Sequence, residues 1–572
     1  MCTHKRRYTL LPMQKSCLQC KAGFEVTNED LEFYDKVSPV FGTRKCSFPP
    51  PALCPECRRQ RMLAWRNERT LYHHPCDLCQ KMTVSVHSPD APYPVYCNPC
   101  WRSEKWNPLS YGQDYDASRS FFEQYSELLK CVPQRAMVND DGMKSENCEY
   151  CQDISYSRNC YLVVGTWKIQ DSMYCRICDL SKFCVDCEGV KLGSELVYES
   201  LDSQKIYRSA YLQNSENCSD CFFGFDLKGC SNCIACVGLR QKKYHIFNQP
   251  YSQAEYEQKR DEFRLFSVSG IEALRATFDE WANQFPRKNM NLQNCEDCLG
   301  DHLFNCRKTL GFVNSKAEFC KYVERSDAPV NCYDVVQSGG PQWCYGSMTV
   351  DEGYFTHFSL WCNQSHHTLY SDNCLSCNEL LGCISLRRKN YCILNKEYSK
   401  EEFDLLAASI LQDMKARGEL GEFFPIGMSP FGYNETNAAE FYPLTKEEGA
   451  ELGASWRDSL PYTTGKETIS PAEMPDDLSS VTDSITHEIL CCTACAKNYK
   501  VIQQELHFYR LMNLPIPRHC PNCRNLRRLY RRNPYKIWER KCAKCKKAIT
   551  TSYPPNGPEI VYCEECYVKE VY

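Results

Sequence analysis

The chain has 572 residues and a net charge of -4, and 43% of its residues are apolar, which is typical of a globular protein too long for one domain. No run of eighteen apolar residues occurs, and the N-terminal "MCTHKRRYTLLPMQKSC" lacks an apolar core, so we expect neither an export signal nor a membrane segment. Cysteine is the outlier, at 43 residues. We therefore expect a cytoplasmic protein whose cysteines serve metal or redox chemistry rather than disulfides.

The charge is segregated along the chain. Residues 1–105 have a balance of +6, residues 106–485 a balance of -19, and residues 486–572 a balance of +9. Two basic ends therefore flank an acidic middle. This asymmetry predicts either an anionic partner for the ends or docking of the ends on the middle.

Residues 1–105 form the first predicted module, which is followed by a connector at 106–144. The module contains four C-x-x-C pairs: Cys17/Cys20, Cys54/Cys57, Cys76/Cys79 and Cys97/Cys100. Two such pairs can direct four sulfurs at one cation about 2.3 Å away, and the seventeen residues between the third and fourth pairs are a zinc-ribbon spacing. We predict one structural zinc for the first two pairs and one for the last two; cross-braced pairing is the alternative.

The middle of the chain is a tandem duplication, with halves at 145–285 and 292–418. "CVGLRQKKYHIFNQPYS" at 236–252 matches "CISLRRKNYCILNKEYS" at 383–399. Each half ends in a predicted helix that begins with an S-x-x-E capping box, at Ser252 and at Ser399.

Within each half, cysteine recurs about every twelve residues. This period predicts one strand-and-turn coil per repeat of a β-solenoid with cysteines packed inside; a meander of short hairpins is the alternative. We interpret most of these cysteines as packing residues. The pairs Cys218/Cys221 and Cys230/Cys233 are the best candidates for an additional zinc site.

A proline-rich and acidic linker at 419–485 leads to the second terminal module at 486–572. Its four pairs repeat the spacings of the first module: Cys492/Cys495, Cys520/Cys523, Cys542/Cys545 and Cys563/Cys566. The two modules together predict four zinc ions. Because four cysteines complete each tetrahedron, no position is left for a catalytic water.

An arginine-rich run follows the "CP" knuckle of each module. In the second module a helix up to Asn533 would place five arginines on one face: Arg524, Arg527, Arg528, Arg531 and Arg532. In the first module the corresponding run includes Arg58, Arg61 and Arg66. A row of guanidinium groups suits phosphates and unstacked bases, whereas docking on the acidic middle or on a protein is the alternative interpretation.

Several motifs resemble those of known proteins. Each end resembles the probable zinc-ribbon domain family, through C-x-x-C, then "LEFYDK" at 31–36, then "CPECR". The whole chain resembles an uncharacterised group of cysteine-rich bacterial zinc-ribbon proteins, through "CDLC", "GLR", "PFGYNET" and "WERKCAKC" in the same order. The resemblance implies zinc and a cytoplasmic setting, and it supplies no catalytic residues.

The sequence therefore predicts a mainly β protein with short helices, in which two tandem zinc-ribbon or treble-clef modules flank a duplicated cysteine-rich β-repeat. No GxGxxG loop after a strand, P-loop or GxSxG motif occurs, so we expect a non-enzymatic protein. The favoured function is an adaptor for RNA or single-stranded nucleic acid. The alternatives are a protein-interaction scaffold and a thiol redox or metal-buffering protein; oligomeric state is left open.

Overall fold

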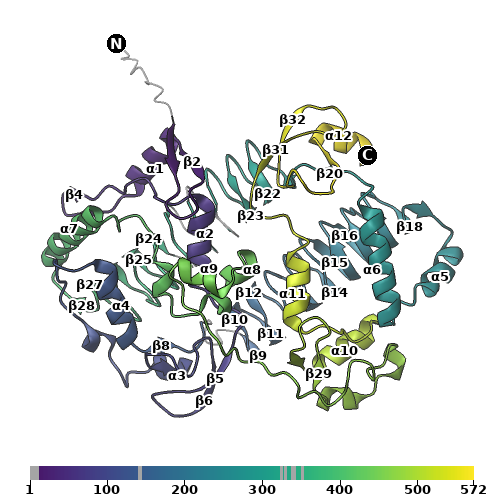
Figure 1. The fold of residues 1–572 in the computed structure, drawn as a ribbon, viewed down its shortest axis with the longest axis horizontal. Coiled ribbons are helices and arrows are strands. Elements are labelled where there is room, and N and C mark those ends of the chain that lie inside the picture. Colours follow the sequence, from purple (N-terminus) through teal and green to yellow (C-terminus); the bar gives the residue numbers. More distant parts are fainter. Residues whose placement is uncertain are drawn as a thin grey trace. The chain divides into compact units, whose positions relative to one another are not determined.

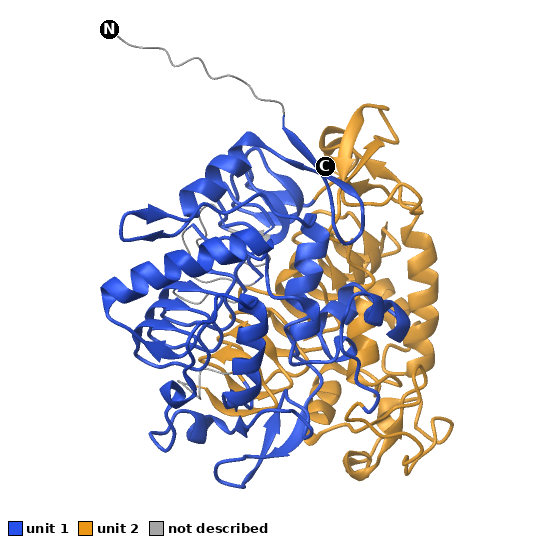
Figure 2. Ribbon diagram, turned by 60° about the vertical axis from the view of Figure 1, so that its left-hand side comes forward, with its two compact units in different colours: residues 1–137, 291–459 blue, residues 138–290, 460–572 orange. Residues whose placement is uncertain are grey.

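The computed structural model describes residues 12–138, 145–322, 326, 332–336, 343–348 and 353–571. These residues form two compact units, residues 1–137 with 291–459 (unit 1) and residues 138–290 with 460–572 (unit 2) (Figure 2). Unit 1 thus combines the N-terminal module with the second repeat half. Unit 2 combines the first repeat half with the C-terminal module.

The secondary structure is mixed, with slightly more strand than helix, where the sequence predicted mainly β with short helices. The longest helices, α6 (Val268–Ala282) and α7 (Lys400–Arg417), have 15 and 18 residues. The predicted capping boxes are confirmed: the Ser252 and Ser399 side chains cap α5 (Gln253–Glu262) and α7. The other helices are α1 (Asn28–Val37), α2 (Pro55–Leu63), α3 (Asn98–Trp101), α4 (Phe121–Cys131), α8 (Asn437–Phe441), α9 (Lys446–Glu451), α10 (Gln503–Met512), α11 (Pro521–Leu529) and α12 (Glu564–Val571), with 3-10 turns η1 (Pro108–Tyr111), η2 (Ile426–Met428), η3 (Tyr433–Glu435), η4 (Leu478–Ser480) and η5 (Asp483–His487).

The first repeat half forms a stack of parallel strands at 146–246, which we call the first ladder (Figure 1). Most successive rungs pair at an offset of twelve residues, as in Gln204↔Glu216 and Ser219↔Ser231, whereas Lys182↔Glu195 is one residue longer. The cysteine period predicted from the sequence is therefore the offset between paired rungs. Its strands are β9 (Glu146–Glu149), β10 (Gln152–Ser155), β11 (Arg158–Tyr161), β12 (Val164–Trp167), β13 (Lys182–Val185), β14 (Glu195–Tyr198), β15 (Gln204–Gln213), β16 (Glu216–Phe225), β17 (Ser231–Val237) and β18 (Lys243–Ile246), followed by the antiparallel β19 (Gln249–Pro250).

The second repeat half forms the second ladder, at 292–393 in unit 1. Most of its rungs also pair at an offset of twelve, as in Tyr354↔His366 and His366↔Asn378, whereas Leu299↔Leu310 is one residue shorter. Its strands are β21 (Leu292–Gln293), β22 (Leu299–Phe304), β23 (Leu310–Ser315), β24 (Tyr354–His357), β25 (His366–Leu369), β26 (Asn378–Leu381) and β27 (Asn390–Ile393), followed by the antiparallel β28 (Lys396–Glu397).

A finer period of three residues runs through the first ladder. The backbone turns at corner residues with a φ of 51° to 56°: Tyr150, Asp153, Tyr156, Asn159 and Leu162. In residues with a side chain this left-handed conformation costs about 1–2 kcal/mol each. Hydrogen bonds between rungs offset that cost; the Leu162 N–H, for example, donates to the Glu149 carbonyl at 3.0 Å.

The residue after each corner points into the ladder, and its environment explains why it is so often cysteine or serine. Ser209, fully buried, accepts a hydrogen bond from the Cys221 N–H of the next rung at 3.0 Å and donates one to the Tyr207 carbonyl at 2.8 Å. Cys151 accepts the Val163 N–H in the same way. At these positions an inward side chain is small and accepts a hydrogen bond, whereas other inward positions hold apolar residues such as Ile206 and Leu212.

The terminal modules consist of short hairpins followed by helices. In unit 1 the strands are β1 (Met13–Ser16), β2 (Gly23–Val26), β3 (Val40–Phe41), β4 (Arg44–Lys45), β5 (Tyr72–Pro75), β6 (Met82–Ser85), β7 (Val95–Tyr96) and β8 (Gln134–Arg135). In unit 2 they are β29 (Leu490–Cys491), β30 (Asn498–Tyr499), β31 (Trp538–Lys541), β32 (Ala548–Thr551) and β33 (Val561–Tyr562), the last pairing with β20 (Arg287–Lys288).

Replacing Ser209 tests whether the ladder needs inward acceptors. Ser209→Val should cost about 1–3 kcal/mol, because the buried Cys221 N–H loses its acceptor, whereas Ser209→Cys keeps a sulfur acceptor and should be close to neutral. Urea unfolding of the full chain, followed by circular dichroism, measures both. Equal losses for the two variants would mean that side-chain volume rather than hydrogen bonding sets the residue type.

Candidate metal centres

The structure brings the sixteen predicted ligands into four groups of four, in each of which all sulfurs lie within 4.8 Å of one another. The groups are Cys17/Cys20/Cys54/Cys57, Cys76/Cys79/Cys97/Cys100, Cys492/Cys495/Cys520/Cys523 and Cys542/Cys545/Cys563/Cys566. Consecutive pairs of each module therefore share a site. The sequential arrangement is confirmed and the cross-braced alternative is excluded.

All four groups are built in the same way, from a hairpin turn and the start of a helix. In the first group, Cys17 and Cys20 lie in the turn between β1 and β2, and Cys54 is the N-cap of α2. The residue after each turn has a positive φ: Lys21, Gln80, Ala496 and Lys546. The helix starts are those of α2, α3, α11 and α12. Repetition of the backbone geometry explains why the spacing repeats.

The sulfur positions fit a tetrahedral ion. Across the first group, Cys20 Sγ lies 3.6 Å from Cys54 Sγ, and across the last, Cys545 Sγ lies 3.7 Å from Cys563 Sγ. A metal–sulfur bond of about 2.3 Å gives a tetrahedral edge of about 3.8 Å, whereas a disulfide bond is about 2.05 Å. These distances match a shared ion and exclude a disulfide between those sulfurs.

Backbone N–H groups favour the thiolate form of the leading cysteine. The Cys563 N–H donates to Cys542 Sγ at 3.2 Å, and the equivalent bond occurs in the other three groups at 3.2 to 3.3 Å. Although burial raises the pKa of Cys542, N–H groups of Cys563, Cys545 and Lys544 lower it to about 6. A thiolate is the form that binds metal, so these backbone N–H groups favour metal binding by the leading cysteine.

The donor sets fit zinc. Each group offers four sulfurs at a soft, tetrahedral site and leaves no coordination position for water or substrate, which is the arrangement of a structural rather than a catalytic ion. Such an ion contributes on the order of 10–16 kcal/mol of apparent binding energy to folding. The chain is therefore a zinc-binding protein by the chemistry of its four-cysteine groups.

The cysteines of the ladders are placed differently, although many of them also stand at C-x-x-C spacing. Neighbouring inward positions are three residues apart, so the spacing arises from the corners. Cys218 and Cys221, the best additional zinc candidates, donate to carbonyls of their own and the next rung: Cys218 to Leu227 at 3.5 Å and Cys221 to Cys230 at 3.7 Å. In the described part of the chain, the ladder cysteines form no group of three or more with metal-ligand geometry.

Burial keeps several ladder thiols protonated. It raises the pKa of Cys306 and Cys392 to about 12 and that of Cys377 to about 11. Neutral thiols are weak nucleophiles and weak ligands. Their placement supports packing over redox chemistry.

The arginines that follow the second "CP" knuckle do not form the expected solvent-facing row. Helix α11 ends at Leu529, earlier than the Asn533 boundary predicted from proline, so Arg531 and Arg532 lie beyond it. Arg524 and Arg528 are 0% and 2% exposed, whereas Tyr530 is 70% exposed. The helix therefore buries part of its arginine face.

These arginines pair with acidic residues of the first ladder. Arg524 Nε lies 2.7 Å from Asp186, and Arg527 Nη2 lies 2.5 Å from Glu199. The remaining contacts are Arg528–Asp186 at 3.2 Å, Arg532–Glu188 at 2.7 Å and Arg532–Asp202 at 2.6 Å; Arg531 is half-buried, and burial lowers its pKa. The sequence alone does not place these carboxylates beside the arginines, because their positions on the rungs depend on the strand register.

The first module repeats this pattern within unit 1. Arg58 makes two hydrogen bonds to Asp334, at 2.7 and 3.2 Å, and Arg61 lies 3.4 Å from Glu422. Arg66 is 2% exposed and lies over the Trp361 ring at 4.9 Å. Three predicted nucleic-acid contacts are thus engaged inside the unit.

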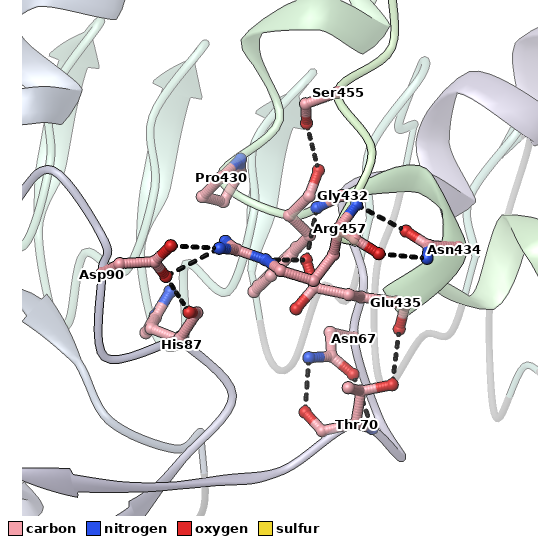
Figure 3. Close-up of polar contacts among 12 residues, drawn as sticks. Asn67, Thr70, His87, Asp90, Pro430, Gly432, Asn434, Glu435, Ser455 and Arg457 are labelled. Carbon is pink, nitrogen blue, oxygen red and sulfur yellow. Dashed lines mark hydrogen bonds and ion pairs between the residues drawn. The ribbon is translucent and has the colours of Figure 1, made fainter. Parts of the chain in front are cut away.

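The motif "PFGYNET" at 430–436 lies in a polar network of unit 1 (Figure 3). The side-chain amide of Asn434 donates to the Arg457 carbonyl and accepts from the Arg457 N–H, and the Arg457 guanidinium contacts Asp90 at 2.6 Å. Glu435 is buried and accepts from the Tyr72 hydroxyl and the Gly432 N–H. Because these groups satisfy one another, we assign the motif a structural role.

Comparison with known proteins finds no matching family and no matching curated protein. Among solved structures, a "putative acetyltransferase" from Desulfovibrio desulfuricans G20 aligns at 8% identity with a TM-score of 0.09, over 42% of this chain and 64% of that one. At that TM-score the match carries no argument. The resemblance to zinc-ribbon proteins therefore rests on the motifs and the four cysteine groups. No helix among the described residues has the length and apolarity needed to span a membrane.

Metal analysis of the purified, reduced chain should find about four zinc ions. Cys545→Ser should lower the content to about three, because it removes one ligand of the last group, whereas Cys221→Ser, a matched change in a ladder C-x-x-C pair, should leave it unchanged. Elemental analysis with thiol counting measures both. Loss of zinc from the Cys221 variant would show that ladder thiols are ligands.

Proposed function

We propose that this protein is a non-enzymatic, zinc-dependent scaffold in which each zinc module docks on a β-solenoid formed by the ladder of its own unit. The observation that carries the proposal is a buried arginine–aspartate pair that recurs in both units. Arg58 meets Asp334 in unit 1, and Arg524 meets Asp186 in unit 2, each with an Nε to oxygen distance of 2.7 Å.

The two pairs occupy equivalent positions. Each arginine directly follows the last cysteine of its "CP" knuckle, and each aspartate is a ladder corner, with φ of 61° in Asp334 and 54° in Asp186. One rung earlier, a tyrosine lies beneath the guanidinium: Tyr322 at 5.8 Å and Tyr174 at 5.1 Å. The same three groups, an arginine, an aspartate and a tyrosine, are therefore in contact in both units. This recurrence supports the proposal that each module docks on its ladder in the same way.

A second contact recurs beside the arginine. In unit 1, Tyr345, which pairs with the residue before Asp334, packs on Tyr34 of α1 with ring centroids 4.6 Å apart. In unit 2, Tyr198 packs on Phe508 and Tyr509 of α10 at 6.1 and 5.6 Å. The phenylalanine–tyrosine motif common to both modules therefore forms the apolar part of the dock.

A docked module leaves its arginine run inaccessible to a large anionic ligand. The acidic charge of the middle is partly neutralised inside each unit, which favours the scaffold interpretation over an arginine-based nucleic-acid site. Affinity capture tests the proposal: protein partners recovered from a lysate should be the same with and without nuclease treatment. Partners lost on nuclease treatment would favour a nucleic-acid adaptor.

Removing the arginine of the docking pair should lower the free energy of unfolding more than removing both charges of the pair. Arg58→Met leaves Asp334 buried without its cation and should cost about 3–5 kcal/mol, whereas adding Asp334→Asn removes the buried charge and should recover part of that loss. Asparagine also tolerates the left-handed corner. Urea unfolding with zinc analysis measures stability and metal separately.

The matched control for Arg58→Met is Arg260→Met, since Arg260 pairs with Asp261 at the surface, where the two side chains are 44% and 73% exposed. That variant should change stability by less than about 1 kcal/mol. If Arg58→Met behaves like the control, the dock does not hold the module and the scaffold proposal fails.

A nucleic-acid contact remains a second candidate, at a different place from the arginines. Lysines around the last four-cysteine group are exposed: Lys541, Lys544, Lys546 and Lys547. Lys544 is paired with Glu570 at 2.6 Å. Exposed cations near Trp538, which is half-buried, could contact phosphates without undocking the module.

If the last module contacts about four phosphates of a single strand, the logarithm of the binding constant for RNA should fall with a slope near -3 against the logarithm of salt concentration, at roughly 0.7 per contact. Lys541→Glu, Lys546→Glu and Lys547→Glu together should remove binding. The control is the triple variant Lys205→Glu, Lys242→Glu and Lys243→Glu, which makes the same charge change at three exposed lysines of the first ladder. Equal weakening in both triple variants would indicate a general charge effect instead of a site.

A further inference from the structure

A cavity of about 230 Å³ lies in unit 2 where the docked module meets the first ladder. Its walls come from the N-terminal half of α6, the loop at 515–519, α11, and the ring side chains of Tyr198 and Tyr211. Its lining includes neither the cysteines of the zinc groups nor the Arg524–Asp186 pair. The cavity is therefore separate from the features on which the proposed function rests.

The cavity lining carries more positive than negative charge. Arg275, Arg518 and Arg527 line it, against the single carboxylate of Glu272. Behind the wall, Glu199 is shared, with its oxygens 3.7 Å from Arg275 and 2.5 Å from Arg527. Two carboxylates thus face three guanidinium groups at the cavity, and Asp476, which is outside the lining, also interacts with Arg518, so positive charge predominates on the cavity wall itself.

Hydrogen bonding shows the same imbalance. In the described part of the chain, these buried atoms have no hydrogen-bond acceptor: Nε and Nη2 of Arg275, Nη1 of Arg518 and Nε of Arg527. Arg275 is 9% exposed, and its ion pairs at 3.7 Å are too long to be hydrogen bonds. Buried donors without acceptors are costly, so an oxyanion reached by small side-chain adjustments would relieve them.

The rest of the lining is mostly apolar: it includes Ile271, Ile516, two prolines and two tyrosines, with Thr493 and His519 as its polar members. An apolar cavity of roughly 150 Å³ accommodates benzene, so this volume suits a ring with one attached anionic group. We propose that the cavity binds a small ligand with a single oxyanion, a carboxylate or a phosphate ester, on a flat apolar body. This goes beyond the scaffold proposal, because it assigns the docked state a ligand of its own.

Isothermal titration of the zinc-loaded full chain tests the proposal with phenyl phosphate and benzoate as probes. At least one should bind with 1:1 stoichiometry, at least tenfold more tightly than inorganic phosphate, and the better probe identifies the anion. Benzylamine, with a similar body and the opposite charge, should give no binding heat.

Two variants locate the site. Ile271→Phe fills the cavity without changing charge and should abolish binding, and Arg518→Met should weaken it at least tenfold. Arg260→Met, an exposed arginine outside the cavity, should bind like the unmodified chain. Zinc content and circular dichroism verify that each variant is folded.

Binding of neither probe, or retention of binding by folded Ile271→Phe, would overturn the proposal. Equal affinity for inorganic phosphate and both probes would also overturn it, since that result describes surface ion binding. None of these outcomes bears on the arginine–aspartate pair, so they can be told apart from failure of the scaffold proposal.

Discussion

The packing of each zinc module on the ladder of its own unit depends on one buried contact. It joins the arginine that follows a zinc knuckle to an aspartate at a ladder corner. Arg58–Asp334 and Arg524–Asp186 are charges removed from water, which is unfavourable unless the geometry is fixed on both sides. The cysteine group fixes one side, because the arginine is the next residue after its last ligand. The register of the ladder fixes the other. Zinc binding therefore positions the arginine of the pair, and the strand register of the repeat positions the aspartate.

The ladders impose a constraint of their own, which explains much of the cysteine content. At part of the inward positions the N–H, such as that of Cys221, has a neighbouring side chain as its acceptor, and serine, threonine and cysteine supply it, whereas other inward positions hold apolar residues such as Ile206 and Leu212. The chain thus uses cysteine for two unrelated purposes, as a metal ligand at its ends and as a packing and hydrogen-bonding group in its middle.

Much of the terminal modules could be predicted from the sequence, because four zinc sites built from adjacent pairs are encoded by local spacing. The twelve-residue period of the middle was also visible. The three-residue period was not recognised, since cysteine shares the inward positions with residues such as Ser209 and Val197, and the corners carry no fixed residue type. The sequence left the partner of the arginine face of α11 open between nucleic acid and the acidic middle, because amphipathicity identifies a face but not its partner; in the structure an acidic ladder corner buries Arg524.

Docking of the ends on the middle was one of the expectations from charge, but the repeat half that each module contacts could not be predicted, because it lies far away in the sequence. Arg58 and Asp334 are separated by 276 residues, and unit 1 lacks its ladder until the second repeat half has been made. Contacts of such separation form late and pay a large closure entropy. If the N-terminal module needed its ladder in order to fold, it would stay unfolded until the second repeat half had been made. Zinc binding requires only residues within the module, so it can hold the knuckle, the helix and the arginine in place until the aspartate becomes available.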